Sequence, residues 1–208
     1  MRVINAGYEI ISEISGTDIL KSIESIGRVC YKSEERITKD SSEKFVANLL
    51  KRGHESVIEH EKITVKFICD RGVSHELVRH RIASFSQEST RYCNYSNEKF
   101  GKELTVIKPL FWKEESEQYK SWLNVMNLVE ETYNSLVESG SKPEEARSIL
   151  PNCLKTEIVV SMNLREWRHF FKLRTATAAH PQMREITIPL LSELKRKIPV
   201  VFDDIDIV

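Results

Sequence analysis

The densest group of chemically active side chains lies between positions 79 and 91. Three arginines, one histidine and four hydroxyl residues fall in this segment: Arg79, His80, Arg81, Ser84, Ser86, Ser89, Thr90 and Arg91. Arginine forks pair bidentately with phosphate oxygens, and Ser or Thr hydroxyls can take the remaining lone pairs. The segment therefore indicates a site for a phosphorylated ligand. Its charge density alone is equally typical of a solvated helix that leads into a polar loop.

The order of these residues adds a second indication. Arg-His-Arg, then seven residues, then Ser89 resembles the signature of the flavin-dependent thymidylate synthases, which methylate dUMP with reduced FAD and methylenetetrahydrofolate. Other segments agree with the family in the same order: Gly53-His54-Glu55-Ser56 with Glu59-His60, Arg71 to Val78, Glu145-Ala146-Arg147 with Leu150-Pro151, and Asn163-Leu164-Arg165 with His169 and Arg174. The resemblance covers most of the chain and is therefore specific.

The resemblance implies a fold and an assembly. We expect an α+β protein, with residues 1–208 forming a single domain in which helices flank a central, mostly antiparallel sheet, the flavin-dependent thymidylate synthase fold. We also expect a homotetramer with active sites at the subunit interfaces. The sequence has no Gly-x-Gly-x-x-Gly motif after a strand, so FAD is not expected to bind in a Rossmann crevice.

The resemblance also implies the site residues. Those for dUMP are Glu76, Arg79, Gln87, Glu88, Ser89, Thr90, Arg91, Arg147 and Arg174. Those for the FAD and folate pocket are His54, Ser56, Arg79, His80, Arg81, Gln87, Asn163, Arg165 and His169.

The resemblance makes Arg174 the catalytic residue. Uracil C5 is a poor nucleophile, and a fixed arginine beside N3 and O2 would stabilise the negative charge that C5 needs to attack a one-carbon unit. NADPH would reduce FAD, and reduced FAD would supply the hydride that converts the methylene to a methyl group. No protein nucleophile is then required. A nucleophilic role for Ser89 is less favoured than a contact with phosphate or base, because no base or nucleophile elbow accompanies it.

Composition limits the partners. Lys plus Arg equals Asp plus Glu at 31 each, which does not favour binding to nucleic acid or to an anionic membrane. The basic residues are concentrated locally, as suits a cleft for small anions. No apolar run approaches the roughly 20 residues of a membrane helix, and no signal peptide is recognisable, so we expect a cytoplasmic protein.

The four cysteines, Cys30, Cys69, Cys93 and Cys153, are scattered and indicate neither a zinc site nor a disulfide framework. Cys153 could be the nucleophile of a cysteine-dependent thymidylate synthase, but a buried structural thiol is the favoured interpretation. A metal site on His75-Glu76 and His80 is also disfavoured. In an unbroken helix, residues five apart lie roughly 140° apart around the axis, whereas Glu76, Arg79 and His80 can share one face. We expect no metal.

Hydrophobic periodicity predicts the elements that position these residues. Strands are predicted at 2–11, 62–69 and 154–162, and helices at 17–31, 41–51, 74–82, 111–139, 164–173 and 180–198, with a short helix from Lys142-Pro143 that carries Arg147. Gly53 is expected to end the second helix and leave His54 in a loop. The aromatic and Met stripe of 111–139 is expected in the core.

Asn163 and Glu166 resemble a helix cap with its reciprocal carboxylate. In the helix that follows, Arg165 and His169 share one face, and Trp167, Phe170 and Phe171 would cover the core. Taken alone, Asn163 could be a plain cap and the two basic residues plain surface charge. Two other functions also stay open: a metal-dependent nucleotide phosphohydrolase, and a non-catalytic nucleotide-sensing module.

Overall fold

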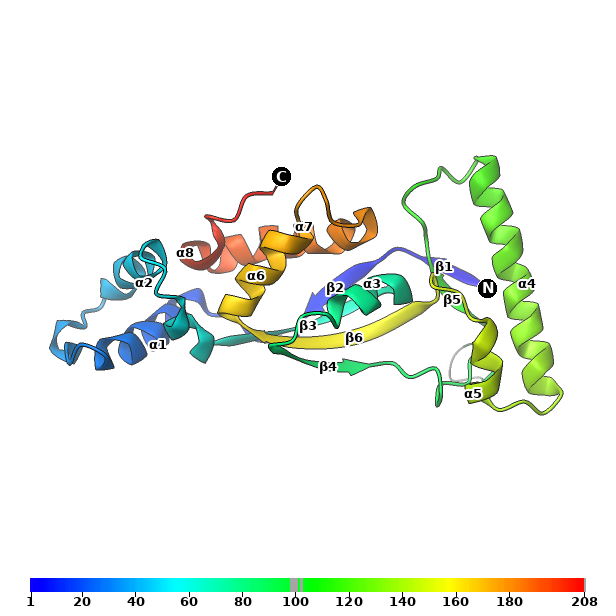
Figure 1. Ribbon diagram of the computed structural model, residues 1–208, viewed down its shortest axis with the longest axis horizontal. Helices are drawn as coiled ribbons and strands as arrows, with labels where there is room; N and C mark the ends of the chain where they lie inside the picture. Colours follow the sequence, from blue (N-terminus) through cyan, green and yellow to red (C-terminus); the bar gives the residue numbers. More distant parts are fainter. Residues whose placement is uncertain (98–100, 102, 208) are drawn as a thin grey trace. The chain divides into compact units, whose positions relative to one another are not determined.

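The computed structural model describes residues 1–97, 101 and 103–207, and these residues form an α+β fold (Figure 1). The described strands are β1 (Arg2–Ile4), β2 (Gly7–Ile10), β3 (Lys62–Asp70), β4 (Ala83–Gln87), β5 (Thr105–Ile107) and β6 (Lys155–Asn163). The described helices are α1 (Gly16–Val29), α2 (Ser41–Lys51), α3 (Arg71–Leu77), α4 (Glu117–Glu138), α5 (Pro143–Ala146), α6 (Leu164–Arg174), α7 (Pro181–Lys197) and α8 (Pro199–Phe202), with 3₁₀ helices η1 (Glu34–Arg36), η2 (Glu55–His60) and η4 (Arg147–Ile149).

The main sheet is antiparallel and has four strands in the order β2-β3-β6-β4. A separate parallel pair joins β1 to β5, with Val3 opposite Val106. The prediction of an antiparallel sheet with helices is therefore confirmed. The prediction of one strand over 2–11 is wrong, because β1 and β2 belong to different sheets and residues 5 and 6 separate them.

The chain divides into two compact units. The first comprises Met1–Gly7, Phe67–Arg79 and Ser86–Ile158, and the second comprises Tyr8–Lys66, His80–Phe85 and the described chain from residue 159 onward. Strands β3, β4 and β6 each continue in sequence from one unit into the other. That the whole chain is one domain stays a prediction.

The first unit has a core around Tyr95, Leu104, Tyr133, Ala146 and Leu154. Helix α4 begins after its cap Ser116, whose hydroxyl accepts a hydrogen bond from the Tyr119 amide, and not at residue 111 as predicted. Its apolar stripe contributes Tyr119, Met126 and Tyr133 to the interior. Trp112 precedes the helix and is exposed, so the expectation that the whole stripe is core was wrong at that end.

The second unit has an aromatic core built on α6. As predicted, Trp167, Phe170 and Phe171 are fully buried. The indole of Trp167 donates to the Ile63 carbonyl at 3.0 Å, and the ring of Phe171 lies 5.9 Å from that of Phe202 in α8. Helix α7 lies beside α6 (Figure 1). Full burial of such large side chains typically contributes about 2 kcal/mol each, so this core fixes the helix that carries Asn163 to Arg174.

The prediction of a helix over 74–82 is wrong in its second half. Helix α3 starts early, at the cap Asp70, which accepts from the Val73 amide at 2.6 Å, and it ends at Leu77. Residues 83–87 alternate in burial with the period of a strand and join the sheet as β4. Pairing in the sheet therefore overrides the local helical pattern. Arg79 and His80 lie beyond the helix, and the shared helical face expected for them with Glu76 does not form.

The other predicted helices and strands lie close to their predicted positions, whereas β5, α8, η1 and η2 were not predicted. Helix α2 spans 41–51 as expected, and Gly53, with φ of 72°, adopts the left-handed conformation that glycine allows at a helix end. His54 follows in a loop before η2. Across residues 1–97, 101 and 103–207, the search for a helix with the length and apolarity of a membrane span finds none.

Candidate active site

In the first unit, the predicted phosphate ligands gather at the turn Ser89–Arg91. Thr90 is buried, and its hydroxyl accepts from Arg147 Nη1 at 3.4 Å. The Ser89 hydroxyl accepts from the Arg91 amide at 3.3 Å, so it shapes the turn. Arg91 is exposed, and its Nε lies 3.9 Å from Glu144, at the limit of an ion pair. Two guanidiniums and two hydroxyls thus meet here with only weak partners, a suitable arrangement for an anion.

Gln87 and Glu88 support this turn from the end of β4. The Gln87 amide nitrogen donates to the hydroxyls of Ser74 at 2.9 Å and Thr156 at 3.2 Å. The Glu88 carboxylate accepts from Tyr95 Oη and from Lys155 Nζ, both at 3.0 Å. The positive charge of Lys155 therefore compensates the Glu88 carboxylate, and Glu88 adds no net negative charge to the turn that would repel an anionic ligand.

Burial and the Glu88 carboxylate both raise the pKa of Tyr95, so its hydroxyl keeps its proton and donates. Burial opposes the charge on Lys155, but hydrogen bonds to Glu157 and Glu88 outweigh burial and raise the pKa of Lys155. The first unit also holds Glu76, half-buried in α3, and Arg79, exposed just beyond that helix.

In the second unit, His80 joins two of the predicted site residues. Its Nδ1 lies 3.1 Å from Glu166 Oε1, and its Nε2 lies 3.1 Å from Arg174 Nε. A guanidinium can only donate, so Nε2 must accept and Nδ1–H donates to Glu166. Burial lowers the pKa of His80, the Arg174 charge lowers it further, and Glu166 opposes both. The neutral imidazole therefore orients the Arg174 guanidinium.

The second unit contains a set of side chains with the spacing of a metal site. The candidate ligand atoms of His80, Glu166 and His169 all lie within 4.8 Å of one another. Both ring nitrogens of His80 are already engaged, one by the cationic Arg174. A divalent cation would have to displace that charge. The contacts therefore favour a hydrogen-bonded support over a metal centre, and the absence of a metal stays a prediction.

Two cavities in the second unit are lined by the predicted flavin and folate residues. One, of about 430 Å³, includes Asn163, Arg165 and His169, which confirms that Arg165 and His169 share a face. The other, of about 350 Å³, includes His54, Ser56 and Arg165. Arg165 lines both cavities. Arg81 is exposed in this unit, in the segment between His80 and β4.

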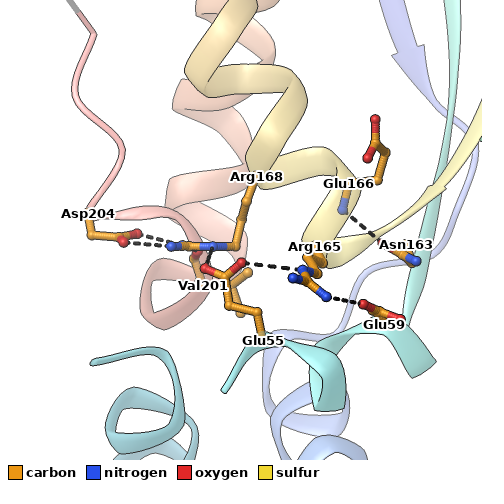
Figure 2. A network of polar contacts seen from close by, with 8 residues as sticks. All are labelled: Glu55, Glu59, Asn163, Arg165, Glu166, Arg168, Val201 and Asp204. Atoms are coloured by element: carbon orange, nitrogen blue, oxygen red, sulfur yellow. Dashed lines mark hydrogen bonds and ion pairs between the residues drawn. The ribbon is translucent and has the colours of Figure 1, made fainter. Parts of the chain in front are cut away.

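Two arginines one turn apart on α6 differ in how firmly they are held (Figure 2). Arg168 is buried, donates to both Asp204 oxygens at 2.6 and 2.7 Å and to Glu55 at 3.3 Å, and also reaches the Val201 carbonyl. Its hydrogen bonds hold the pKa of Asp204 below the ordinary value. Arg165 is 52% exposed and pairs with Glu59 at 2.6 Å. Arg168 is thus a structural cation, whereas Arg165 can change partners.

Asn163 caps α6, since its Oδ1 accepts from the Glu166 amide at 2.8 Å. The reciprocal half of the expected cap is wrong, because the Glu166 carboxylate turns to His80 instead. Asn163 is also one of the residues that line the 430 Å³ cavity. The cap and a ligand contact are therefore compatible roles for this residue.

Glu166 and Glu55 are the supporting residues that sequence reasoning missed. Glu166 was recognised only as part of a cap, yet it fixes His80, 86 positions away. Glu55 lies between the predicted His54 and Ser56 and accepts from Arg168 while its other oxygen lies 3.7 Å from Arg165. The signal that the sequence offered for both was a carboxylate next to basic residues.

Cys153 has the properties of a structural thiol. Burial raises its pKa, which keeps the sulfur protonated at neutral pH. Its Sγ contacts Met126 Sδ at 3.2 Å. A nucleophilic cysteine needs the opposite setting, one that favours the thiolate. The alternative of a cysteine-dependent synthase is therefore not supported by this environment.

Comparison with known proteins gives consistent matches. Residues 11–200 match the family model Thy1, described as thymidylate synthase complementing protein. The flavin-dependent thymidylate synthase of Pyrococcus furiosus is 40% identical over 172 residues, covering 82% of this chain and 70% of that protein. Its counterpart in Geobacter sulfurreducens is 33% identical over 184 residues, covering 85% and 78%.

Solved structures give the same fold. The UMP/dUMP methylase PolB from Streptomyces cacaoi, bound with 5-Br dUMP, superimposes with a TM-score of 0.76 at 23% identity, covering 98% of this chain and 96% of that one. The likeness at this identity concerns the fold alone.

Proposed function

The chain belongs to the Thy1 family of flavin-dependent thymidylate synthases, the enzymes that methylate dUMP, and we propose that it takes the one-carbon unit from methylenetetrahydrofolate and the hydride from FAD reduced by NADPH. The observation that carries the assignment of roles is the support of Arg174 by a neutral, buried His80. This contact fixes the orientation of the Arg174 guanidinium through a neutral acceptor.

Arg174 is the proposed catalytic residue. Its Nε donates to His80 Nε2, a neutral acceptor, and this contact orients the guanidinium. Placed beside N3 and O2 of uracil, it would stabilise the negative charge that develops as C5 attacks the one-carbon unit. A donor that is oriented in advance does not have to reorganise during the reaction, which is why such groups contribute strongly to catalysis.

The turn Ser89–Arg91 and Arg147 are the proposed phosphate site. This proposal is supported by the guanidiniums of Arg91 and Arg147 and the hydroxyls of Ser89 and Thr90, which lie together and have only weak partners within the protein. Gln87 and Glu88 hold the turn, and Glu76 and Arg79 complete the set proposed for the sugar and base. Ser89 is proposed as a ligand contact and not as a nucleophile. Its hydroxyl oxygen accepts from the Arg91 amide, and no general base is assigned to it.

The residues of the second unit fit FAD by their chemistry. The diphosphate needs cationic or amide donors, and the cavities with Asn163, Arg165 and His169 and with His54 and Ser56 offer them. Arg165 can exchange Glu59 for a phosphate oxygen, because solvent screens an exposed ion pair and it contributes little to stability. Arg79, His80, Arg81 and Gln87 are proposed to contribute from the signature. When bound and reduced, FAD supplies the hydride that completes the methyl group.

We also propose a homotetramer with active sites at subunit interfaces, located in the cytoplasm, without nucleic-acid or membrane partners. The family resemblance supports the assembly. The balance of 31 basic and 31 acidic residues supports small anionic ligands over polyanionic surfaces.

The test is an omission assay on the purified protein. It is incubated with FAD, NADPH, dUMP and methylenetetrahydrofolate, each component is left out in turn, and dTMP is measured by mass. We expect dTMP only when the folate, a reductant and FAD are all present. Metal-dependent release of phosphate from dUMP would instead support a phosphohydrolase, and ligand binding without product would support a sensing module. Either result would overturn the proposal.

A further inference from the structure

The second unit contains a third cavity, of about 600 Å³, between α1, η1 and α2, which we call the α1–α2 cavity. It is lined by residues between Arg28 and His54. It shares Tyr31, Leu49 and His54 with the 350 Å³ cavity that holds Ser56 and Arg165. The α1–α2 cavity is therefore next to the proposed folate pocket, with His54 on the boundary, and nothing in the proposed chemistry uses it.

The lining of this cavity is basic. It contains five cationic side chains, Arg28, Lys32, Arg36, Lys44 and Arg52, against two carboxylates, Glu35 and Asp40. Two of the cations are already compensated: Arg28 pairs with the buried Glu24 at 2.7 Å, and Arg36 lies 3.5 Å from Glu35. In the described part of the chain, Lys32, Lys44 and Arg52 have no carboxylate within ion-pair distance. A concave surface with uncompensated positive charge attracts an anion.

The floor of the cavity is apolar and aromatic. Phe45 and Leu49 line it, and the Arg28 guanidinium lies over the Phe45 ring at 4.4 Å. A volume of this size is in the range of small-molecule pockets. The occupant that fits has a flat or aliphatic stem and several separate negative charges. Lys32 and Lys44 act as point charges, whereas compact phosphate groups are usually met by converging arginine forks.

We propose that the α1–α2 cavity binds the glutamate tail of the folate co-substrate, with Lys44 and Arg52 pairing to its carboxylates. The inference rests on the proposed function, and it takes His54, a residue of the proposed FAD and folate pocket, as the place where the reacting ring of the folate lies. The folate carries its carboxylates at the end opposite that ring, joined by an aromatic spacer. Further γ-linked glutamates add one carboxylate each, so the cavity selects folates by the length of their anionic tail.

The test compares methylenetetrahydrofolate with one and with five glutamates in steady-state dTMP formation. For the natural chain we expect the pentaglutamate to have a KM about fivefold lower, which is the effect of roughly two exposed ion pairs. In the double variant Lys44→Ala/Arg52→Ala the two folates should have about the same KM. The value of kcat should be unchanged, because the substitutions do not touch the reacting ring. Higher ionic strength should reduce the preference in the natural chain.

The matched control is Lys21→Ala/Lys51→Ala, which removes the same charge from α1 and α2 at exposed positions outside the cavity. It should keep the full preference. Equal KM values for the two folates in the natural chain, or a preference that survives Lys44→Ala/Arg52→Ala, would overturn the inference while dTMP formation still upheld the proposed function. A rise in KM for NADPH instead of the folate would assign the cavity to a phosphate. Absence of dTMP with either folate would overturn both.

Discussion

Arg168 of the second unit and Arg91 and Arg147 of the first unit are held in opposite ways. In the second unit, Arg168 is buried and makes hydrogen bonds to Asp204, Glu55 and the Val201 carbonyl. In the first unit, Arg91 is exposed with Glu144 at 3.9 Å, and Arg147 has a single hydrogen bond of 3.4 Å to Thr90. The first arrangement satisfies the guanidinium within the protein. The second leaves most of its donors for a ligand.

This difference separates structural cations from functional ones in a chain with 31 basic residues. Breaking a buried ion pair is costly, because it leaves an uncompensated charge in the interior. Arg168 therefore holds Asp204, which follows α8, close to Glu55 in η2. An exposed pair costs little to exchange, so Arg165, Arg91 and Arg147 can trade an internal carboxylate or hydroxyl for a ligand oxygen. Arg174 is a third case, because its Nε donates to the neutral, buried His80.

The largest expected effect is that of Arg174→Ala. Removing one donor aimed at developing charge typically costs a factor of about 100 to 1000 in kcat, and we expect dTMP formation to fall at least that far. Reduction of FAD by NADPH should be largely kept, as followed by flavin absorbance. The control is Arg196→Ala, an exposed change near the end of α7. Methylation that survives in Arg174→Ala would refute the ring-activation role.

Next is the contrast between Arg168→Ala and Arg165→Ala. Loss of the buried charge network should lower the free energy of unfolding by about 3 kcal/mol, whereas loss of the exposed pair should change it far less. Urea unfolding at one fixed protein concentration measures both, since assembly makes stability depend on concentration. Equal destabilisation by the two variants would remove the distinction between them.

A smaller effect is expected for Ser89→Ala. Losing one hydrogen bond to a charged ligand costs about 1.5–3 kcal/mol at most, so KM for dUMP should rise by roughly tenfold with turnover still measurable. Steady-state kinetics with varied dUMP checks this. Complete loss of turnover at unchanged dUMP affinity would instead support a nucleophilic serine.

The smallest effect concerns pH. The folded state holds the pKa of His80 below its ordinary value near 6.5, so the unfolded chain binds a proton that the folded chain does not. This stabilisation is fully present above about pH 6.5 and is lost as the pH falls toward the lowered folded pKa. Comparing Tm at pH 5.5 and 7.5 should show a smaller decrease for His80→Asn than for the natural chain. Equal decreases would mean that His80 charges freely in the folded state.

How far the sequence alone predicted the molecule depended on whether the deciding contact was local. Helix α2 and the cap of α6 were predicted correctly, because an amphipathic repeat ended by Gly53 and an Asx residue at a helix start are local signals. The end of α3 was missed because β4 forms by pairing with β6, which lies far away in sequence.

The candidate site shows the same limit. The resemblance supplied the residue types, and the turn at Ser89 with Arg147 and the cavity with Asn163 and Arg165 gather them as groups. The partner of His80 could not be predicted, since 86 residues separate it from Glu166. The pairing of Arg168 with Asp204 could not be predicted either. Arg165 and Arg168 look alike in sequence, and only burial distinguishes them.

The most direct test of the account is to measure dUMP and FAD binding separately in Arg147→Ala and Arg165→Ala. Titration calorimetry gives the affinity for dUMP, and quenching of flavin fluorescence gives the affinity for FAD. We predict that Arg147→Ala weakens dUMP binding about tenfold or more and leaves FAD binding unchanged, because a charge-assisted hydrogen bond is lost only at the phosphate site. Arg165→Ala should do the reverse. Unchanged dUMP affinity in Arg147→Ala, or loss of dUMP affinity in Arg165→Ala, would contradict the division of roles between these arginines.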